Sequence, residues 1–180
     1  MNNRILITGA LGQLGEFFID SLINQGNYVL ATDIKNSNDL NCDFEIFDVH
    51  DLKKGDELIK KYKINQVYNF AAILSAKGEI NPAKTWDLNN AGFFNIVDIC
   101  LKNKINKIFW PSSIAVFGKN SNLNFASIDE PMCPETIYGA SKLACEKAMY
   151  YYNFKNIIDI RSLRLPGICL LYTSPSPRDT

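Results

Sequence analysis

The sequence is poor in metal-binding side chains, with a single histidine and five cysteines in 180 residues. No two cysteines have the CxxC spacing of a zinc site, so we expect no metal. An odd number of cysteines without that pairing is typical of reduced thiols, and we therefore expect a cytoplasmic protein. The only histidine, His50, follows an apolar segment without an evident partner, so we expect it to lie at the surface.

The charges show no excess of either sign, because 19 Lys and Arg residues are matched by 19 Asp and Glu residues. This mixture argues against nucleic acid and membrane surfaces as partners. No apolar run approaches the roughly 20 residues of a membrane span. No export signal is visible before the first apolar segment. The hydrophobic content of 47% is enough for one buried core, and we expect one domain.

Residues 4–15, with the sequence RILITGALGQLG, combine an apolar strand with three glycines spaced three apart. Gly9 allows the backbone to turn after the strand. Gly12 leaves room for a pyrophosphate at the N-terminus of the following helix, where the helix dipole is positive. Gly15 allows the helix to pack closely on the strand. This pattern predicts a dinucleotide-binding turn.

A second predicted strand, residues 28–33, ends in Asp33, 18 residues after Gly15. An acid at this position is expected to accept hydrogen bonds from the hydroxyls of the adenosine ribose. The same carboxylate would repel a 2′-phosphate. The sequence therefore predicts NAD, rather than NADP, as the cofactor.

Strands and helices alternate along the chain, which predicts an α/β fold with a doubly wound parallel sheet, the Rossmann fold. We expect further strands at residues 44–47, 66–72, 107–110 and 157–165, and helices at residues 52–62, 81–102 and 137–153. Asp51 and Asn81 are the expected N-caps of the first two of these helices. We expect residues 1–168 to form the NAD-binding domain. Residues 169–180 contain two prolines and no periodicity, and we expect an unrelated or disordered tail.

Tyr138 and Lys142 lie four residues apart on a predicted helix and so share one face. A tyrosine that acts as a base at neutral pH needs its pKa lowered by about 2 to 3 units, which a nearby ammonium and a nicotinamide cation can supply. Ser112 and Ser113 follow the fifth predicted strand, at the sheet edge where such folds bind ligands. A serine hydroxyl there can hold the reacting oxygen of a substrate while Tyr138 takes its proton.

These motifs together resemble the extended short-chain dehydrogenase/reductase family, also described as NAD-dependent epimerases and dehydratases. The segments AAILSAKGE (71–79), WDLN (86–89), FWPSSIAVFG (109–118), YGASKLACE (138–146) and DIRSLRLPGI (159–168) are similar to L-threonine 3-dehydrogenases of the short-chain type. The resemblance covers residues 4–168. It implies oxidation of the 3-hydroxyl of L-threonine to 2-amino-3-oxobutanoate, with hydride transfer to NAD and no metal.

The resemblance also implies a role for each matching residue. Tyr138 would be the base, Lys142 its electrostatic partner and a ribose ligand, and Ser113, assisted by Ser112, would orient the substrate oxygen. Leu74, Ser75 and Gly78 would face the substrate. The implied cofactor-binding residues are Gly9, Gly12, Gln13, Leu14, Gly15, Asp33, Ile34, Asp48, Val49, Phe70, Ala71, Ala72, Asn89, Lys142 and Pro166.

The resemblance leaves other functions open. A nucleotide-sugar 4-epimerase uses the same Ser, Tyr and Lys, and a non-catalytic NAD-binding module would keep the fold. A dehydratase of this family has an acid beside the catalytic hydroxyl, whereas Ile114 and Ala115 follow Ser113 here. Relatives continue after the PGI motif with a substrate-binding lobe, so the resemblance implies a C-terminally truncated chain in which this lobe is missing. It further implies a possible homodimer through residues 89–102 and 137–153.

Overall fold

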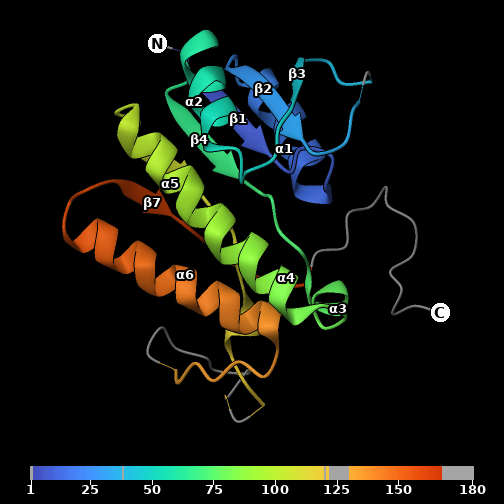
Figure 1. The fold of residues 1–180 in the computed structure, drawn as a ribbon, viewed down its shortest axis with the longest axis vertical. Helices are drawn as coiled ribbons and strands as arrows, with labels where there is room; N and C mark the ends of the chain where they lie inside the picture. Colours follow the sequence, from blue (N-terminus) through green and yellow to red (C-terminus); the bar gives the residue numbers. More distant parts are fainter. Residues whose placement is uncertain (1, 38, 120, 122–129, 168–180) are drawn as a thin grey trace.

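Six parallel strands form the central sheet of the computed structural model, which describes residues 2–37, 39–119, 121 and 130–167 (Figure 1). These strands are β1 (Arg4–Thr8), β2 (Tyr28–Asp33), β3 (Asp43–Ile46), β4 (Gln66–Asn69), β5 (Lys107–Phe109) and β7 (Asp159–Arg161). Their order across the sheet is β3-β2-β1-β4-β5-β7, and neighbouring strands are parallel. The chain builds outward from β1 to β3 and then crosses back to β4, which confirms the predicted doubly wound topology.

Different helices cover the two faces of the sheet. Helix α1 (Gln13–Asn24) packs on the face to which Ile5 and Ile7 contribute. Helices α2 (Leu52–Lys61), α5 (Gly92–Lys102) and α6 (Ile137–Phe154) pack on the opposite face, to which Leu6 contributes. Alternate residues of β1 thus enter different cores, as expected for a central strand buried on both faces.

The predicted helix over residues 81–102 consists of three successive segments. These are α4 (Pro82–Trp86), a π-helical turn η1 (Asp87–Ala91) and α5. The Asn81 side chain accepts a hydrogen bond from the Lys84 N–H at 3.1 Å, so the predicted N-cap is confirmed. The π-helical turn inserts an extra residue into the helix and brings Asn89 into a buried position.

The predicted single strand over residues 157–165 is wrong. The structure divides it into β7, in the main sheet, and β8 (Arg164–Leu165), which pairs with β6 (Ser112–Ser113) in a separate two-stranded ladder. The interruption is confined to Trp110 and Pro111 on one side and to Ser162 and Leu163 on the other. Proline provides a physical reason, because its ring fixes φ near −65°, away from the roughly −120° of a parallel strand. The Trp110 N–H bonds to the Arg161 carbonyl at 3.0 Å and the Ser112 N–H to the Leu163 carbonyl at 2.9 Å, so the register is the same on both sides of the interruption.

The expected tail at residues 169–180, and most of the surface loop before α6, lie outside the described residues. Two short elements were not expected from the sequence: α3 (Ser75–Gly78) and the 3-10 turn η2 (Ile114–Val116). Within the described part of the chain, every helix is too short or too polar to span a bilayer.

The N-cap of α2 gives a test of the local structure. The Asp51 carboxylate accepts a hydrogen bond from the Lys54 N–H at 2.9 Å, as the sequence predicted. We expect Asp51→Ala to lower the free energy of unfolding by about 1 kcal/mol, because one N–H at the helix start loses its acceptor. Urea denaturation measures this change. Asp51→Asn keeps an acceptor and is the matched control, and equal losses in both variants would contradict the capping role.

Candidate active site

The glycine turn lies between β1 and α1, at the carboxyl edge of the sheet. Gly9 has a φ of +64°, and a Cβ on it would lie 2.7 Å from the backbone nitrogen of Ala71, so only glycine fits where the loops after β1 and β4 meet. A Cβ on Gly15 would lie 2.6 Å from the Ala10 Cα, so the start of α1 packs closely on the turn that follows β1. A Cβ on Gly12 would meet only the Gly9 carbonyl, at 3.3 Å, so the start of α1 is open.

Asp33 ends β2 beside this turn. Its carboxylate accepts hydrogen bonds from the backbone N–H of Leu11, within the glycine turn, and from the N–H of Lys35, both at 3.2 Å. The carboxylate therefore faces the turn, as a ligand to an adenosine ribose must. Ile34, the next predicted cofactor residue, is exposed beside it. Gln13 and Leu14 lie in the first turn of α1.

The loop after β4 forms the next part of the edge. The Thr8 hydroxyl donates to the Asn69 side chain at 2.6 Å, which joins the ends of β1 and β4. Asn89 accepts a hydrogen bond from the Ile73 N–H at 2.8 Å and donates to the Ile73 carbonyl and the Ser141 hydroxyl, both at 3.1 Å. The predicted cofactor residue Asn89 thus connects this loop to α6. Phe70, Ala71 and Ala72, which precede Ile73, are all half-buried.

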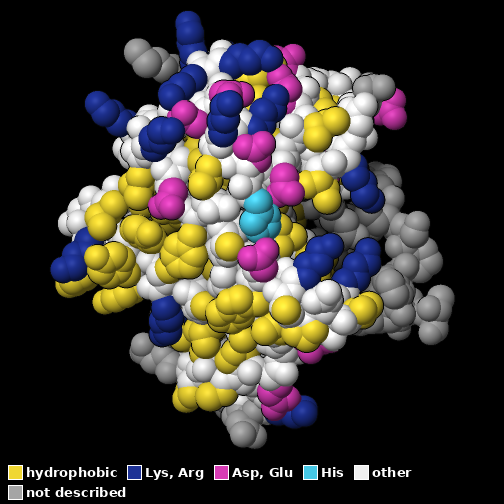
Figure 2. Space-filling model, in the orientation of Figure 1, with side chains coloured by type: hydrophobic (Ala, Val, Ile, Leu, Met, Phe, Trp, Pro, Cys, Tyr) yellow, Lys and Arg dark blue, Asp and Glu magenta, His cyan; other side chains and the backbone are white. Residues whose placement is uncertain are grey.

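The expectation that His50 has no partner is wrong, although the residue is exposed. Its Nδ1 lies 3.0 Å from Asp48 and its Nε2 lies 3.2 Å from Asp87, which belongs to η1. Figure 2 shows this single cyan side chain between acidic side chains. The His50 N–H also bonds to Asp48 and, as the largest contribution, holds the pKa of that carboxyl below its usual value. The imidazole therefore connects the loop that contains Asp48 and the buried Val49 to η1.

Tyr138 lies in the first turn of α6, where Thr136 caps the helix by accepting the Gly139 N–H at 2.9 Å. A Cβ on Gly139 would collide with the Ala115 carbonyl oxygen, so α6 packs directly on η2. The Ser113 hydroxyl accepts the Ala115 N–H at 3.1 Å. Burial raises the pKa of the Tyr138 phenol, and an interaction with the Ser113 side chain opposes the rise. The expected lowering of the Tyr138 pKa is thus absent from the protein alone.

Lys142 lies one helical turn after Tyr138 and is only 3% exposed. Its Nζ donates to the Pro111 carbonyl at 2.7 Å and lies 4.1 Å from the centre of the Trp110 ring. Burial lowers the pKa of Lys142 to about 8, and the charge of Glu146 acts in the opposite direction. The ammonium lies 5.5 Å from the centre of the Tyr138 ring, so the predicted pair does share one face of α6.

Ser112 is 2% exposed and differs from its neighbour Ser113 in its partner. Its hydroxyl donates to the Glu146 carboxylate at 2.5 Å, and Arg164 holds the same carboxylate. Neither Glu146 nor Arg164 was identified from the sequence. The spacing of four residues from Lys142 to Glu146 was the available signal, because it places both on the helix face of Tyr138.

The predicted substrate residues Leu74, Ser75 and Gly78 lie at α3. Leu74 is exposed, Ser75 is half-buried and Gly78 is buried against Thr85, whose hydroxyl donates to its carbonyl at 3.0 Å. The Glu79 carboxylate accepts the Ile137 N–H at 2.9 Å, so α3 is attached to the helix turn that carries Tyr138. Pro166 is exposed after β8.

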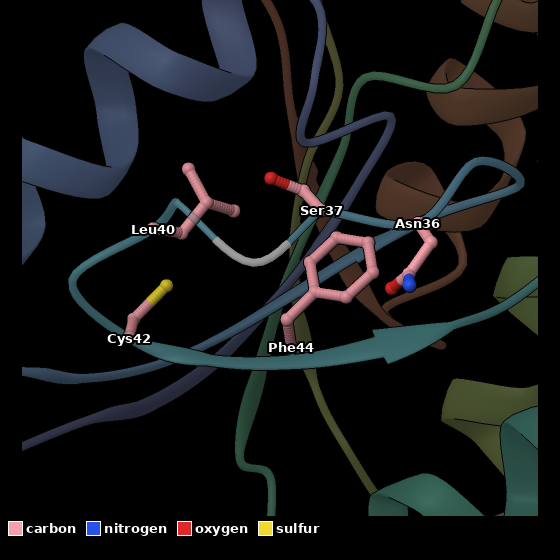
Figure 3. Close-up of a pocket in the computed structure, with 5 residues that line it drawn as sticks. All are labelled: Asn36, Ser37, Leu40, Cys42 and Phe44. Atoms are coloured by element: carbon pink, nitrogen blue, oxygen red, sulfur yellow. The ribbon is translucent and has the colours of Figure 1, made fainter.

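A hollow of about 260 Å³ lies between the loop after β2 and the strand β3 (Figure 3). It contains none of the predicted site residues and is lined by Asn36, Ser37, Leu40, Cys42 and Phe44. The candidate site is instead the open carboxyl edge of the sheet. Because β4 lies between β1 and β5, the glycine turn and the serines after β5 are two strand spacings, roughly 10 Å, apart along this edge.

Comparisons with known proteins show the family of this chain. The model of the NAD dependent epimerase/dehydratase family matches residues 5–177, and so runs past residue 168. An uncharacterized epimerase/dehydratase of Staphylococcus saprophyticus is 38% identical over 175 residues, which cover 92% of this chain and 53% of the relative. The chain thus spans about half the length of the curated relatives it matches.

Two solved structures are similar to the fold described above. A monomeric L-threonine 3-dehydrogenase from a metagenome has a TM-score of 0.90 at 35% identity, covering 96% of this chain and 56% of that one. A UDP-glucose 4-epimerase from Brucella ovis, in complex with NAD, has a TM-score of 0.82 at 26% identity, covering 90% of this chain and 51% of that one.

Proposed function

Because this chain belongs to the NAD-dependent epimerase/dehydratase family, we propose that it is an NAD-dependent oxidoreductase whose chemistry is carried out by Ser113, Tyr138 and Lys142. The residues present fit NAD. The open start of α1 suits a pyrophosphate, Asp33 faces the same turn, and a buried ammonium lies beside a phenol at the far end of the edge. Bound NAD would supply the hydride acceptor and a positive charge on its nicotinamide ring.

The observation that carries this proposal is the position of the buried Lys142 ammonium, 5.5 Å from the centre of the Tyr138 ring, with the Ser113 side chain interacting with the same tyrosine. A substrate hydroxyl placed between these two groups would donate its proton to Tyr138 while Ser113 fixes its orientation. Lys142 would favour the phenolate electrostatically, because a positive charge nearby lowers the pKa of a phenol. Oxidation of the carbon that carries this hydroxyl also needs a hydride acceptor, which bound NAD would supply.

We propose L-threonine as the substrate, oxidised at its 3-hydroxyl to 2-amino-3-oxobutanoate. The support is the higher TM-score and identity to an L-threonine 3-dehydrogenase, 0.90 and 35%, than to a UDP-glucose 4-epimerase, 0.82 and 26%. The test is to add L-threonine and NAD to the full chain and to follow NADH absorbance. Conversion of UDP-glucose without NADH release from L-threonine would favour the 4-epimerase, which is the second candidate.

The carboxylate of Asp33 predicts a cofactor preference. We expect the chain to bind NAD about 10-fold or more tightly than NADP, because a negative charge beside the ribose repels a 2′-phosphate. Asp33→Asn removes the charge but keeps an acceptor for the Leu11 N–H, so we expect most of the preference to disappear. Isothermal titration with each cofactor measures both affinities. Asp39→Asn, on the exposed loop after β2, is the control, and an unchanged preference in Asp33→Asn would contradict the assignment.

A homodimer is a further proposal, which rests on the family resemblance and on exposed apolar side chains. Figure 2 shows yellow side chains gathered over the region of α5 and α6. Sedimentation velocity would decide between a dimer and a monomer, the state named for the metagenomic relative. The large exposed apolar residues in and beside these helices are Trp86, Phe94, Tyr150, Tyr151, Phe154 and Ile157.

A further inference from the structure

The carboxylate of Glu146 connects α6, β6 and β8 beside the candidate site. It extends from α6, two helical turns after Tyr138, and accepts the hydroxyl of Ser112 in β6 at 2.5 Å. Arg164, in β8, donates to it with Nε at 2.9 Å and with Nη2 at 2.9 Å. One side chain on the helix therefore holds both strands of the small ladder.

The register of that ladder places the two partners of Glu146 opposite each other. Ser112 lies opposite Arg164, and Ser113 lies opposite Leu165. The two residues that bind Glu146 are thus direct cross-strand neighbours. Ser113, the proposed partner of Tyr138, is the next residue along the chain after Ser112. A movement of β6 relative to α6 would displace the Ser113 hydroxyl together with the Ser112 hydroxyl.

Burial strengthens the hydrogen bonds of Glu146 with Ser112 and Arg164, so that they can hold β6 in a fixed position against α6. Ser112 is buried, and the exposed fractions of the Glu146 and Arg164 side chains are 14% and 27%. A two-point contact between a guanidinium and a carboxylate defines an orientation as well as a distance. Partial burial also reduces screening by water, in contrast to the Asp159–Arg161 pair nearby, whose side chains are 41% and 80% exposed.

We propose that Glu146, held by Arg164, is a positioning residue that fixes β6 against α6, so that the Ser113 hydroxyl meets the Tyr138 phenol. This inference rests on the proposed function in that it takes Tyr138 as the catalytic base. Glu146 itself touches neither substrate nor cofactor in this scheme. It acts through Ser112 and the backbone of β6.

Alkaline spectrophotometric titration of the full chain tests the proposal without any substrate. The difference between the wild-type curve and that of Tyr138→Phe isolates the Tyr138 phenol. We expect Ser113→Ala to raise the Tyr138 midpoint by about one pH unit, because a hydrogen bond that favours the phenolate is lost. We expect Glu146→Gln to raise it in the same direction, and the double variant to add nothing further.

The direction in which the Tyr138 midpoint moves in Glu146→Gln distinguishes a positioning role of Glu146 from a purely electrostatic one. Removal of a negative charge would by itself lower the pKa of a nearby phenol, whereas loss of the Ser113 contact raises it. Ser112→Ala is a milder second variant, because it leaves the Glu146–Arg164 pair intact, and we expect a smaller rise. Asp159→Asn, which breaks the exposed ion pair, should leave the midpoint unchanged.

Two outcomes would overturn the inference. One is a Tyr138 midpoint that stays at the wild-type value, or falls, in both Glu146→Gln and Ser112→Ala. The other is a midpoint that does not respond to Ser113→Ala, since the contact to be positioned would then have no effect. If L-threonine is not the substrate, the activity assay shows this separately, because no NADH forms. The titration tests the role of Glu146 whether or not L-threonine is the substrate.

Discussion

Tyr138→Phe is expected to lower the rate of NADH formation by about 10³-fold and to leave the affinity for NAD close to the wild-type value. The variant keeps the ring but removes the hydroxyl that takes the substrate proton, and general base catalysis contributes about 10² to 10⁴ to such rates. The ring is half-buried against its neighbours, and Phe fills the same space. The loss should therefore be catalytic rather than structural.

The measurement is steady-state NADH formation from L-threonine, together with isothermal titration of NAD into each variant. Tyr150→Phe is the matched control, because Tyr150 lies on the same helix but is 70% exposed. It should retain wild-type turnover. A Tyr138→Phe enzyme with undiminished turnover would show that another group takes the proton.

The pH dependence of turnover follows from the environment of the same phenol. Burial raises the pKa of Tyr138, so the free protein keeps the phenol protonated at neutral pH, and the interaction with Ser113 opposes that rise only in part. The missing stabilisation has to come from positive charge in the complex. We expect turnover to rise with pH through the midpoint of Tyr138 in the presence of NAD.

Local patterns explain why much of the fold and site could be predicted. The glycine spacing at Gly9 to Gly15, the strand that ends in Asp33 and the caps Asp51 and Asn81 each depend on a few adjacent residues, and each has the predicted conformation. The face shared by Tyr138 and Lys142 follows from helix geometry alone.

Contacts between distant segments could not be predicted in the same way. The break between β7 and β8 lies opposite Trp110 and Pro111, which come about 50 residues earlier in the chain, between β5 and β6. The partner of His50 in η1 and the partners of Glu146 in β6 and β8 come together only after folding. Such polar contacts leave no periodic signal in the sequence, because each partner is a single residue on another element.

Lys142→Met is expected to have opposite effects on stability and on function. The buried Lys142 ammonium lacks hydration, and its pKa falls from 10.5 to about 8, so the folded state binds the proton less tightly than the unfolded chain. Methionine has a similar volume and no charge. We expect the free energy of unfolding at pH 7 to rise by about 1 to 2 kcal/mol, less than the full cost of the charge, because the Pro111 carbonyl loses its donor. Turnover should fall by about 10²-fold or more.

The pH dependence of this stability difference identifies its cause. Between about pH 8 and pH 10.5 the unfolded chain keeps the Lys142 proton while the folded chain loses it, so the wild-type protein gains stability as the pH rises. The advantage of Lys142→Met should therefore shrink over that interval, which urea denaturation at pH 7 and near pH 10 would show. Lys147→Met, at an exposed position of the same helix, should show no such dependence. If Lys142→Met is instead less stable than wild type at pH 7, the hydrogen bond to Pro111 and the contact with the Trp110 ring outweigh the loss of hydration. Lys142 would then stabilise the fold in addition to its role in the chemistry.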